Sequence, residues 1–127
     1  MIGIDIVNLK RFENFLNSHK DKALKKFLCE SEITLINSSQ SAAGFFAAKE
    51  AISKALKTGI GKECGFKDIK IDKDKNGAPF FTLPNSIVQK YQITQTSLSI
   101  SHDSGFAIAV AVINSSLKDP NPISHLD

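Results

Sequence analysis

The sequence predicts an α+β fold in which a mainly antiparallel sheet with hairpins packs against a long central helix. The chain opens with isoleucine at positions 2, 4 and 6, the spacing of a strand with one apolar face. Residues 41–57 are rich in alanine and carry apolar residues at helical spacing. The second half contains two hairpin signals around glycine-containing turns. A strand, then helices, then hairpins is an order typical of such a fold.

Asp5 lies in the middle of the first strand, on the face opposite the isoleucines. Strands disfavour aspartate, so its position needs a reason. Either that face is exposed to water or the carboxylate binds something, and the sequence leaves both alternatives open.

Helical segments are expected between the first strand and the central helix. Residues 9–16 and 23–28 carry apolar side chains at helical spacing. Ser31 or a neighbour is the expected cap of a third short helix through residues 33–36, and residues 37–39 are expected to form a loop.

The central helix has two distinct faces. Glu50 and Lys54 lie one turn apart on one of them, beside Lys49. Gly59 is the expected C-cap. The core-facing stripe consists of Phe45, Ala48, Ile52, Ala55 and Leu56.

The second half predicts a hairpin from residues 69–74 and 79–83, which flank the turn sequence Asn76-Gly77. A short helix is expected next, at residues 84–91. Two strands, at residues 98–100 and 106–113, are expected to follow it, joined by a turn at residues 102–105.

The totals indicate one domain, expected over residues 1–116, with a flexible tail over residues 117–127. The sequence has neither the roughly 18 consecutive apolar residues of a membrane span nor a secretory signal at its start, so we expect a cytoplasmic protein that does not bind membranes. The net charge of +3 is too small for a typical nucleic-acid binder. Cys29 and Cys64 form no metal-type pair, and we expect both to be reduced.

Four features carry possible chemistry: Asp5, the pair Glu50 and Lys54, the segment 58–61, and the segment 101–103. Each also has an ordinary structural explanation. A Glu–Lys pair at this spacing is a common helix ion pair worth about 0.2–0.5 kcal/mol. Glycines after a helix usually form a cap and a turn, and a histidine near a hairpin is more often a hydrogen-bonded structural residue than a catalyst.

In combination the features indicate phosphate chemistry. Two carboxylates without a histidine or cysteine cluster suit Mg²⁺, which bridges one or two carboxylates to substrate phosphates. Nearby lysines and open backbone amides of residues 58–61 would complete a diphosphate site. The residues alone do not identify the phosphate ester.

Several motifs resemble those of the holo-acyl-carrier-protein synthases, the short bacterial type of 4′-phosphopantetheinyl transferase, and they occur in the same order along the chain. The resemblance spans residues 2–114 and implies that family's fold. It also implies transfer of 4′-phosphopantetheine from coenzyme A to a serine of apo acyl carrier protein. The products would be 3′,5′-ADP and the holo carrier for fatty-acid synthesis. The matching segments are residues 3–7 and 9–11, 46–51, 53–55, 58–61, 66–71, 76–79 and 99–103.

The resemblance implies catalytic roles for Asp5, Glu50 and Lys54. Asp5 and Glu50 would hold Mg²⁺ against the diphosphate of coenzyme A, and Lys54 would stabilise charge on the leaving 3′,5′-ADP. Glu50, directly or through a metal-bound water, is the candidate base for the carrier serine. Asp5 is the competing candidate, and the sequence does not decide between them.

The resemblance also implies binding roles. A homotrimer with each site at a subunit interface is expected, and Lys10 and Arg11 would meet the acidic carrier protein. The residues expected to bind coenzyme A are Lys49, Lys54, Thr58, Gly59, Gly61 and His102.

Three positions depart from the family pattern. Relatives often carry basic residues in the loop before the central helix and one residue before the FAAKE motif, where this chain has residues 36–39 and Phe45. Lys57 stands where glycine is common. These departures affect the nucleotide-end contacts and leave the expected catalytic positions intact.

Two other classes of function are alternatives. A non-catalytic module that binds coenzyme A or a carrier protein would not need Asp5, Glu50 and Lys54 together. A weak nucleic-acid binder would need stacking aromatics among its basic residues, and the sequence lacks that pattern. Which carrier is served, and how well acylated coenzyme A is tolerated, stay open.

Overall fold

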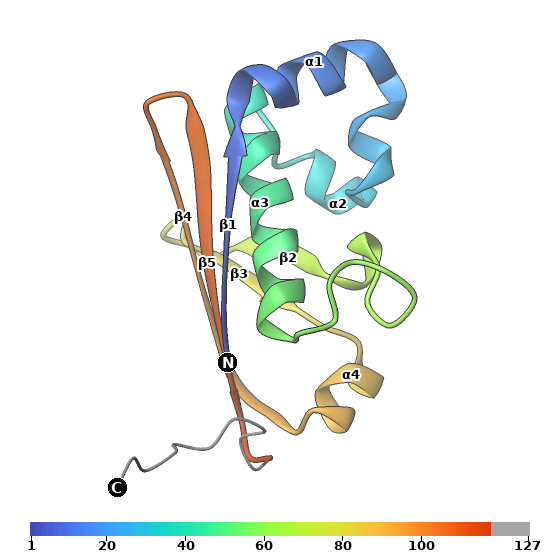
Figure 1. Ribbon diagram of the computed structural model, residues 1–127, viewed down its shortest axis with the longest axis vertical. Coiled ribbons are helices and arrows are strands. Elements are labelled where there is room, and N and C mark those ends of the chain that lie inside the picture. The colour runs from blue at the N-terminus through green and yellow to red at the C-terminus, as the bar shows by residue number, and fades with distance from the viewer. Residues whose placement is uncertain (118–127) are drawn as a thin grey trace, which may run out of the picture.

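A three-stranded antiparallel sheet and one long helix form the frame of the molecule (Figure 1). The structure is a computed structural model and describes residues 1–117. The sheet has the order β1 (Ile2–Asn8), β5 (Phe106–Ser115), β4 (Ile93–Asp103), with β5 in the centre. Helix α3 (Ser39–Ala55) runs along one face of this sheet. The predicted α+β class, with an antiparallel sheet on a central helix, is confirmed.

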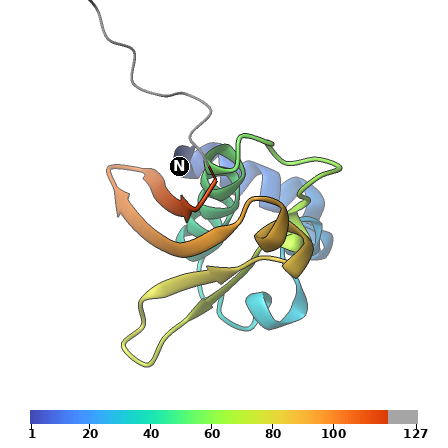
Figure 2. The same ribbon diagram turned by 90° about the horizontal axis from the view of Figure 1, so that it is seen from below.

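The remaining elements surround α3. Helix α1 follows β1 directly, and the β2–β3 hairpin lies next to β4 (Figure 2). The hairpin around Asn76-Gly77 and the short helix after it occur where the sequence predicts them. Residues 118–127, most of the expected tail, lie outside the described residues. The bounds are α1 Leu9–His19, α2 Glu30–Ile33, α4 Asn85–Lys90, β2 Lys70–Lys73 and β3 Pro79–Thr82, with 3₁₀ turns at Lys20–Lys22, Leu24–Lys26 and Phe66–Asp68.

The ends of α3 differ from the prediction by two residues at each side. Ser38 is the N-cap, and its hydroxyl accepts a hydrogen bond from the Ser41 backbone N–H. Residues that were expected to form a loop therefore begin the helix. At the other end Leu56 is the C-cap, and Lys57 follows with a φ of 64°. The left-handed residue that stops the helix is thus Lys57, although Gly59 also has a positive φ of 64°.

The predicted short helices were partly wrong. Residues 23–28 form only the 3₁₀ turn Leu24–Lys26. Helix α2 covers Glu30–Ile33, ahead of the expected position, because Cys29 is its N-cap and donates its backbone N–H to Glu32 Oε1 at 2.9 Å. A glutamate three residues after the cap is half of a capping box, which starts the helix at this point.

The core lies between α3 and the sheet and is built largely from small residues. Ala107, Ala109 and Ala111 of β5 are fully buried against α3. The predicted core stripe is buried as expected. Alanine on both surfaces allows the helix to approach the sheet closely, which brings side chains of β1 within reach of α3.

The opposite face of the sheet is apolar on β1 and β5 and lacks any covering helix among the described residues (Figure 1). Ile2, Ile4 and Ile6 are 71%, 60% and 58% exposed. Their cross-strand partners on β5 are Val112, Val110 and Ile108. We call these six residues the isoleucine face. The isoleucines therefore do not enter the core of this chain, and Asp5 lies on the side that packs against α3.

Two composition-based expectations can be compared with the described residues. Cys29 and Cys64 are both free thiols. Burial raises the pKa of the Cys64 thiol to about 11, so it stays protonated at neutral pH. No helix within residues 1–117 has both the length and the apolar character needed to cross a membrane.

Candidate active site

Asp5, Glu50 and Lys54 meet where β1 crosses α3. Lys54 Nζ lies 2.9 Å from Asp5 Oδ1 and 3.3 Å from the carbonyl oxygen of Ile4. Glu50 lies one helical turn before Lys54, and it lines a pocket of about 410 Å³ together with Asp5. The structure thus brings together the three residues that the sequence singled out as catalytic candidates.

The ordinary explanations for these residues do not hold in this structure. Lys54 pairs with Asp5, on another element, rather than with Glu50 on its own helix. The carboxylate of Asp5 does not face open solvent: it packs toward α3 and is only 17% exposed. A charged group on the core-facing side of a strand requires a compensating partner, and Lys54 supplies one.

The carboxyl of Glu50 is electrostatically strained. Its pKa is raised above the usual value, first because burial disfavours the charged form and second because Asp5 is nearby, while Lys54 partly opposes the shift. A carboxylate whose pKa moves toward neutrality is better suited to accept a proton than an ordinary surface glutamate.

Aromatic residues form the wall of the pocket beside the two carboxylates. Phe12 and Phe15 come from α1, and Phe46 comes from α3, one turn before Glu50. The Phe12 and Phe46 rings are 5.5 Å apart at their centroids. Arg11 also lines this pocket. The sequence placed Phe46 on the helix face of Glu50, but the aromatic wall depends on how α1 packs and was not foreseen.

The donor set at this site fits a hard cation that also binds substrate. Among residues 1–117, no three His, Cys, Asp or Glu side chains gather closely enough to hold a metal by themselves. Asp5 and Glu50 supply two carboxylates, and Mg²⁺ is commonly bound by that number together with water and substrate phosphates. The ammonium of Lys54, held by Asp5 Oδ1 and the Ile4 carbonyl, shows that these oxygens already accommodate a positive charge.

Lys49 is not brought to this site, which corrects the expectation that it binds coenzyme A. Its side chain is fully buried, and its ammonium donates to Glu32 Oε1 at 2.7 Å and to the carbonyl oxygens of Phe27 and Phe66, each at 2.9 Å. All three donors of the ammonium are therefore used inside the protein. Glu32 also accepts the backbone N–H of Ile71 at 2.9 Å, so the pair joins α2, α3 and β2.

Three of the four backbone amides in the segment after α3 are not open, contrary to what the sequence suggested. The backbone N–H groups of Thr58 and Gly59 both donate to the Ser53 carbonyl, at 3.1 and 3.3 Å. The Gly61 N–H donates to the Cys64 carbonyl at 3.0 Å. The Thr58 hydroxyl donates to the Gly59 carbonyl at 2.8 Å. These groups stabilise the turn itself.

His102 lies away from Asp5 within one chain. It is near the end of β4, and its register partner on β5 is Ala107, which in turn pairs with Val7 on β1. A whole strand therefore separates it from the carboxylates. Its Nε2 donates to the Gln40 carbonyl oxygen at 2.8 Å, so the histidine is also a structural contact between β4 and α3.

The positions that depart from the family pattern have structural roles. Phe45 is 2% exposed and belongs to the core. Residues 37–39 provide the cap of α3, where the Asn37 and Ser38 backbone N–H groups both donate to Ser41 Oγ at 3.1 Å.

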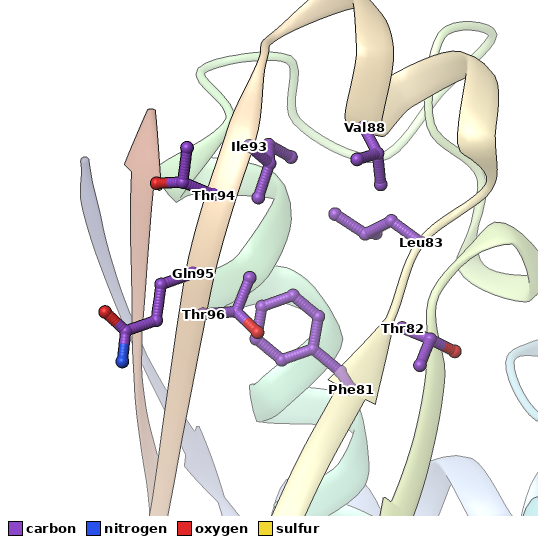
Figure 3. Close-up of a pocket in the computed structure, with 8 residues that line it drawn as sticks. All are labelled: Phe81, Thr82, Leu83, Val88, Ile93, Thr94, Gln95 and Thr96. Carbon is purple, nitrogen blue, oxygen red and sulfur yellow. The ribbon is translucent and has the colours of Figure 1, made fainter. Parts of the chain in front are cut away.

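A second pocket, of about 250 Å³, lies between β3, α4 and β4 (Figure 3). Phe81, Leu83, Val88 and Ile93 point toward one another around it. Its remaining lining residues are threonine and glutamine, so it contains no ionisable group that could act as an acid or base. The chemistry is therefore assigned to the first pocket.

The fold and the site define a class of protein: the chain belongs to the 4′-phosphopantetheinyl transferase superfamily, whose family model matches residues 1–111. It is 59% identical over 113 residues to the holo-acyl-carrier-protein synthase of Nautilia profundicola, a match that covers 89% of this chain and 98% of that protein. Within the superfamily, its relatives place it among the holo-acyl-carrier-protein synthases.

Solved structures agree with this assignment. The crystal structure of Helicobacter pylori holo-acyl-carrier-protein synthase in complex with coenzyme A has a TM-score of 0.86 and 53% identity, covering 90% of this chain and 100% of that one. The Bacillus anthracis synthase in complex with coenzyme A (3′,5′-ADP) has a TM-score of 0.75 and 38% identity, covering 91% and 96%. The expected transferase fold is confirmed.

Proposed function

We propose that this chain transfers 4′-phosphopantetheine from coenzyme A to a serine of apo acyl carrier protein and releases 3′,5′-ADP, with Mg²⁺ at Asp5 and Glu50. The observation that carries the proposal is that Asp5 and Glu50 line one pocket of about 410 Å³ while Lys54 pairs with Asp5, in a chain of this family. A non-catalytic binding module would not need this combination.

Glu50 is the proposed base for the carrier serine. Burial and the nearby Asp5 raise its pKa above the usual value, which makes it a better proton acceptor than a surface glutamate, and it lines a pocket that a substrate can enter. Asp5 is a weaker candidate because Lys54 already donates to its carboxylate. Lys54, half-exposed on a flexible chain, would stabilise charge on the departing 3′,5′-ADP. A bound Mg²⁺ would supply charge neutralisation for the diphosphate and its leaving oxygen.

Coenzyme A is proposed to bind against the C-terminal end of α3. The H. pylori relative has coenzyme A bound in its structure, which supports this ligand. Lys54 and the Thr58–Gly61 turn lie at the C-terminal end of α3. The amides of Thr58, Gly59 and Gly61 are used within the turn, so this segment would contact coenzyme A through its surface, where open space at Gly59 and Gly61 allows close approach. Lys49 is left out because its ammonium is buried and fully hydrogen-bonded.

The carrier protein is proposed to approach along α1. Arg11 lines the pocket that holds the carboxylates, and Lys10 is exposed next to it. An acidic partner would be attracted to these charges, and its serine would enter beside the aromatic wall. The kind of carrier, for fatty-acid synthesis or another pathway, is not specified by these contacts, and a cytoplasmic location stays a prediction.

The isoleucine face supports self-association, and we propose the homotrimer that the family resemblance implies. Three exposed isoleucines on one strand, flanked by apolar residues of β5, form a surface that a monomer would leave in water. Burial of this face between identical copies would remove that cost. Within one chain β5 separates His102 from Asp5, so a contribution of His102 to the site would have to come from another copy of the chain.

The test is intact-mass measurement of an apo acyl carrier protein incubated with this chain, coenzyme A and Mg²⁺, beside a sample with EDTA. A gain of one phosphopantetheine that is lost with EDTA supports both the reaction and the metal. A gain that persists with EDTA overturns the metal assignment alone. No gain with several apo carriers, from protein shown to bind coenzyme A, would leave the non-catalytic module as the better description.

A further inference from the structure

Lys54 occupies a cation position at the candidate site. Its ammonium contacts Asp5 Oδ1 at 2.9 Å and the Ile4 carbonyl oxygen at 3.3 Å. Asp5 is one of the two carboxylates proposed to hold Mg²⁺, so the lysine and the metal would use the same carboxylate. In this arrangement the Lys54 ammonium is bound to protein oxygens.

We infer that Lys54 is a resident counter-ion that a bound metal displaces from Asp5, and that this displacement releases the ammonium for the diphosphate. The inference rests on the proposed function, because it takes the metal site at Asp5 and Glu50 as given. It adds an order of events: the metal binds first, and the lysine becomes available as a consequence.

Electrostatics favours an exchange over shared occupancy. Mg²⁺ binds carboxylate oxygen at about 2.0–2.1 Å and requires near-octahedral geometry. A second cation on the same carboxylate would lie within a few ångströms of the metal, where like charges repel strongly. Asp5 is largely buried, so solvent can screen this repulsion only weakly.

The exchange needs no movement of the backbone. The Lys54 side chain is 51% exposed, so its four-carbon stem can rotate toward solvent without disturbing α3. Asp5 is largely buried, but the Lys54 side of the ion pair is half-exposed, and a pair that is open to solvent on one side changes an equilibrium by only about 1.5- to 5-fold, so a metal can displace the lysine. Lys49, on the same helix, is different: it is fully buried and fully hydrogen-bonded, and it should not respond to the metal.

The first experiment measures the affinity for Mn²⁺, as a paramagnetic substitute for Mg²⁺, by electron paramagnetic resonance without coenzyme A. Lys54→Met should bind Mn²⁺ about 2- to 5-fold more tightly than the wild type, because the competing cation is gone. Arg11→Gln is the matched control, since it removes one positive charge from the wall of the same pocket without removing a hydrogen bond to Asp5. Arg11→Gln should increase the Mn²⁺ affinity by less than 2-fold if the gain in Lys54→Met comes from loss of the competing ammonium rather than from the change in net charge.

The second experiment follows lysine side-chain signals by NMR after ¹³C labelling at the ε carbon. Addition of Mg²⁺ should shift the Lys54 signal and leave the Lys49 signal unchanged. Equal Mn²⁺ affinity in the wild type and Lys54→Met, or an unmoved Lys54 signal, overturns the exchange while the transferase proposal stands. The Mn²⁺ measurement is repeated with 3′,5′-ADP present. Mn²⁺ binding that appears only with 3′,5′-ADP also overturns the exchange. Absence of Mn²⁺ binding both with and without 3′,5′-ADP overturns the proposed metal site itself.

Discussion

Gly3 of β1 lies directly against Ala51 of α3: a Cβ atom at position 3 would stand 1.9 Å from the Ala51 carbonyl oxygen and 2.6 Å from the Ala55 backbone nitrogen. Only glycine permits this approach, because any side chain would collide with backbone atoms that cannot move independently of the helix. Asp5 comes two residues later on the same face of β1, so the contact at Gly3 sets how closely Asp5 approaches Lys54.

Gly3→Ala is therefore expected to destabilise the fold by about 1–3 kcal/mol or more, because strand and helix must separate. The surviving folded protein should also lose activity as the Asp5–Lys54 distance increases. Gly61→Ala is the control, since a Cβ there meets open space and should change stability by less than about 0.5 kcal/mol. Thermal unfolding followed by circular dichroism measures both, and equal stability of the two variants would contradict the argument.

Glu50→Gln should lower turnover by about 10²- to 10⁴-fold, the usual contribution of a general base, while the protein stays folded. In the wild type, kcat/KM should fall as pH decreases through the raised pKa of Glu50, because the protonated carboxyl can neither accept a proton nor bind a metal. Stopped assays of holo carrier formation across pH measure both effects. A near-normal rate for Glu50→Gln would rule out the assignment of this residue as base and ligand.

Glu50→Gln should also be more stable than the wild type at neutral pH. The pKa of Glu50 is raised in the folded state, so the folded protein binds this proton more tightly than the unfolded chain does. Its stabilising contribution is complete below the unfolded pKa of about 4.3 and is lost as pH rises through the folded pKa. The Tm advantage of Glu50→Gln should thus be seen at pH 7–8 and disappear in acid. A variant less stable than the wild type at pH 8 would show that the ionised form is favoured instead.

Lys49→Met should destabilise the protein by about 3–5 kcal/mol, because it leaves the buried Glu32 carboxylate without its charge partner. A second change, Glu32→Gln, should recover part of the loss by removing that unpaired charge. Lys90→Met is the matched control, since Lys90 pairs with Glu63 at the surface and should have little effect on stability. Urea unfolding gives the free energies, and the folded fraction of Lys49→Met should keep the wild-type KM for coenzyme A.

Lys57→Gly should stabilise the protein by up to about 1 kcal/mol. Lys57 ends α3 with a φ of 64°, a conformation that costs about 1–2 kcal/mol for a residue with a Cβ, offset in part by the greater freedom of glycine in the unfolded chain. Lys57→Ala should give no such gain, because alanine keeps the Cβ. A higher Tm for the alanine variant than for the glycine variant would contradict this explanation.

Ile4→Glu should dissociate the proposed trimer, because it places a charge in the isoleucine face. Gln89→Glu on exposed α4 introduces the same charge elsewhere and should leave association unchanged. Size-exclusion chromatography with light scattering measures the mass of each. A wild-type chain that is monomeric at micromolar concentration would remove the basis for a shared site.

Local sequence patterns were sufficient to predict most elements of this chain. Alternating isoleucines predicted β1, alanine and apolar periodicity predicted α3, and Asn76-Gly77 predicted the β2–β3 hairpin. The spacing of Glu50 and Lys54 placed both on one face of the helix. These features depend on residues fewer than about five positions apart, where propensity and periodicity decide the conformation. By contrast, the boundaries of α2 depended on the Glu32 cap, which a helical periodicity does not reveal.

The roles of the two lysines on α3 were decided by tertiary structure. Lys49 and Lys54 are five residues apart and chemically identical, yet one is buried in an ion pair and the other reaches the site. Their partners, Glu32 and Asp5, are 17 and 49 residues away in the chain, and only the packing of α2 and β1 on α3 brings each to its lysine. The sequence by itself determined which elements form and which side chains share a face. Which face became the site followed from long-range packing, because burial and electrostatic pairing are properties of the assembled core.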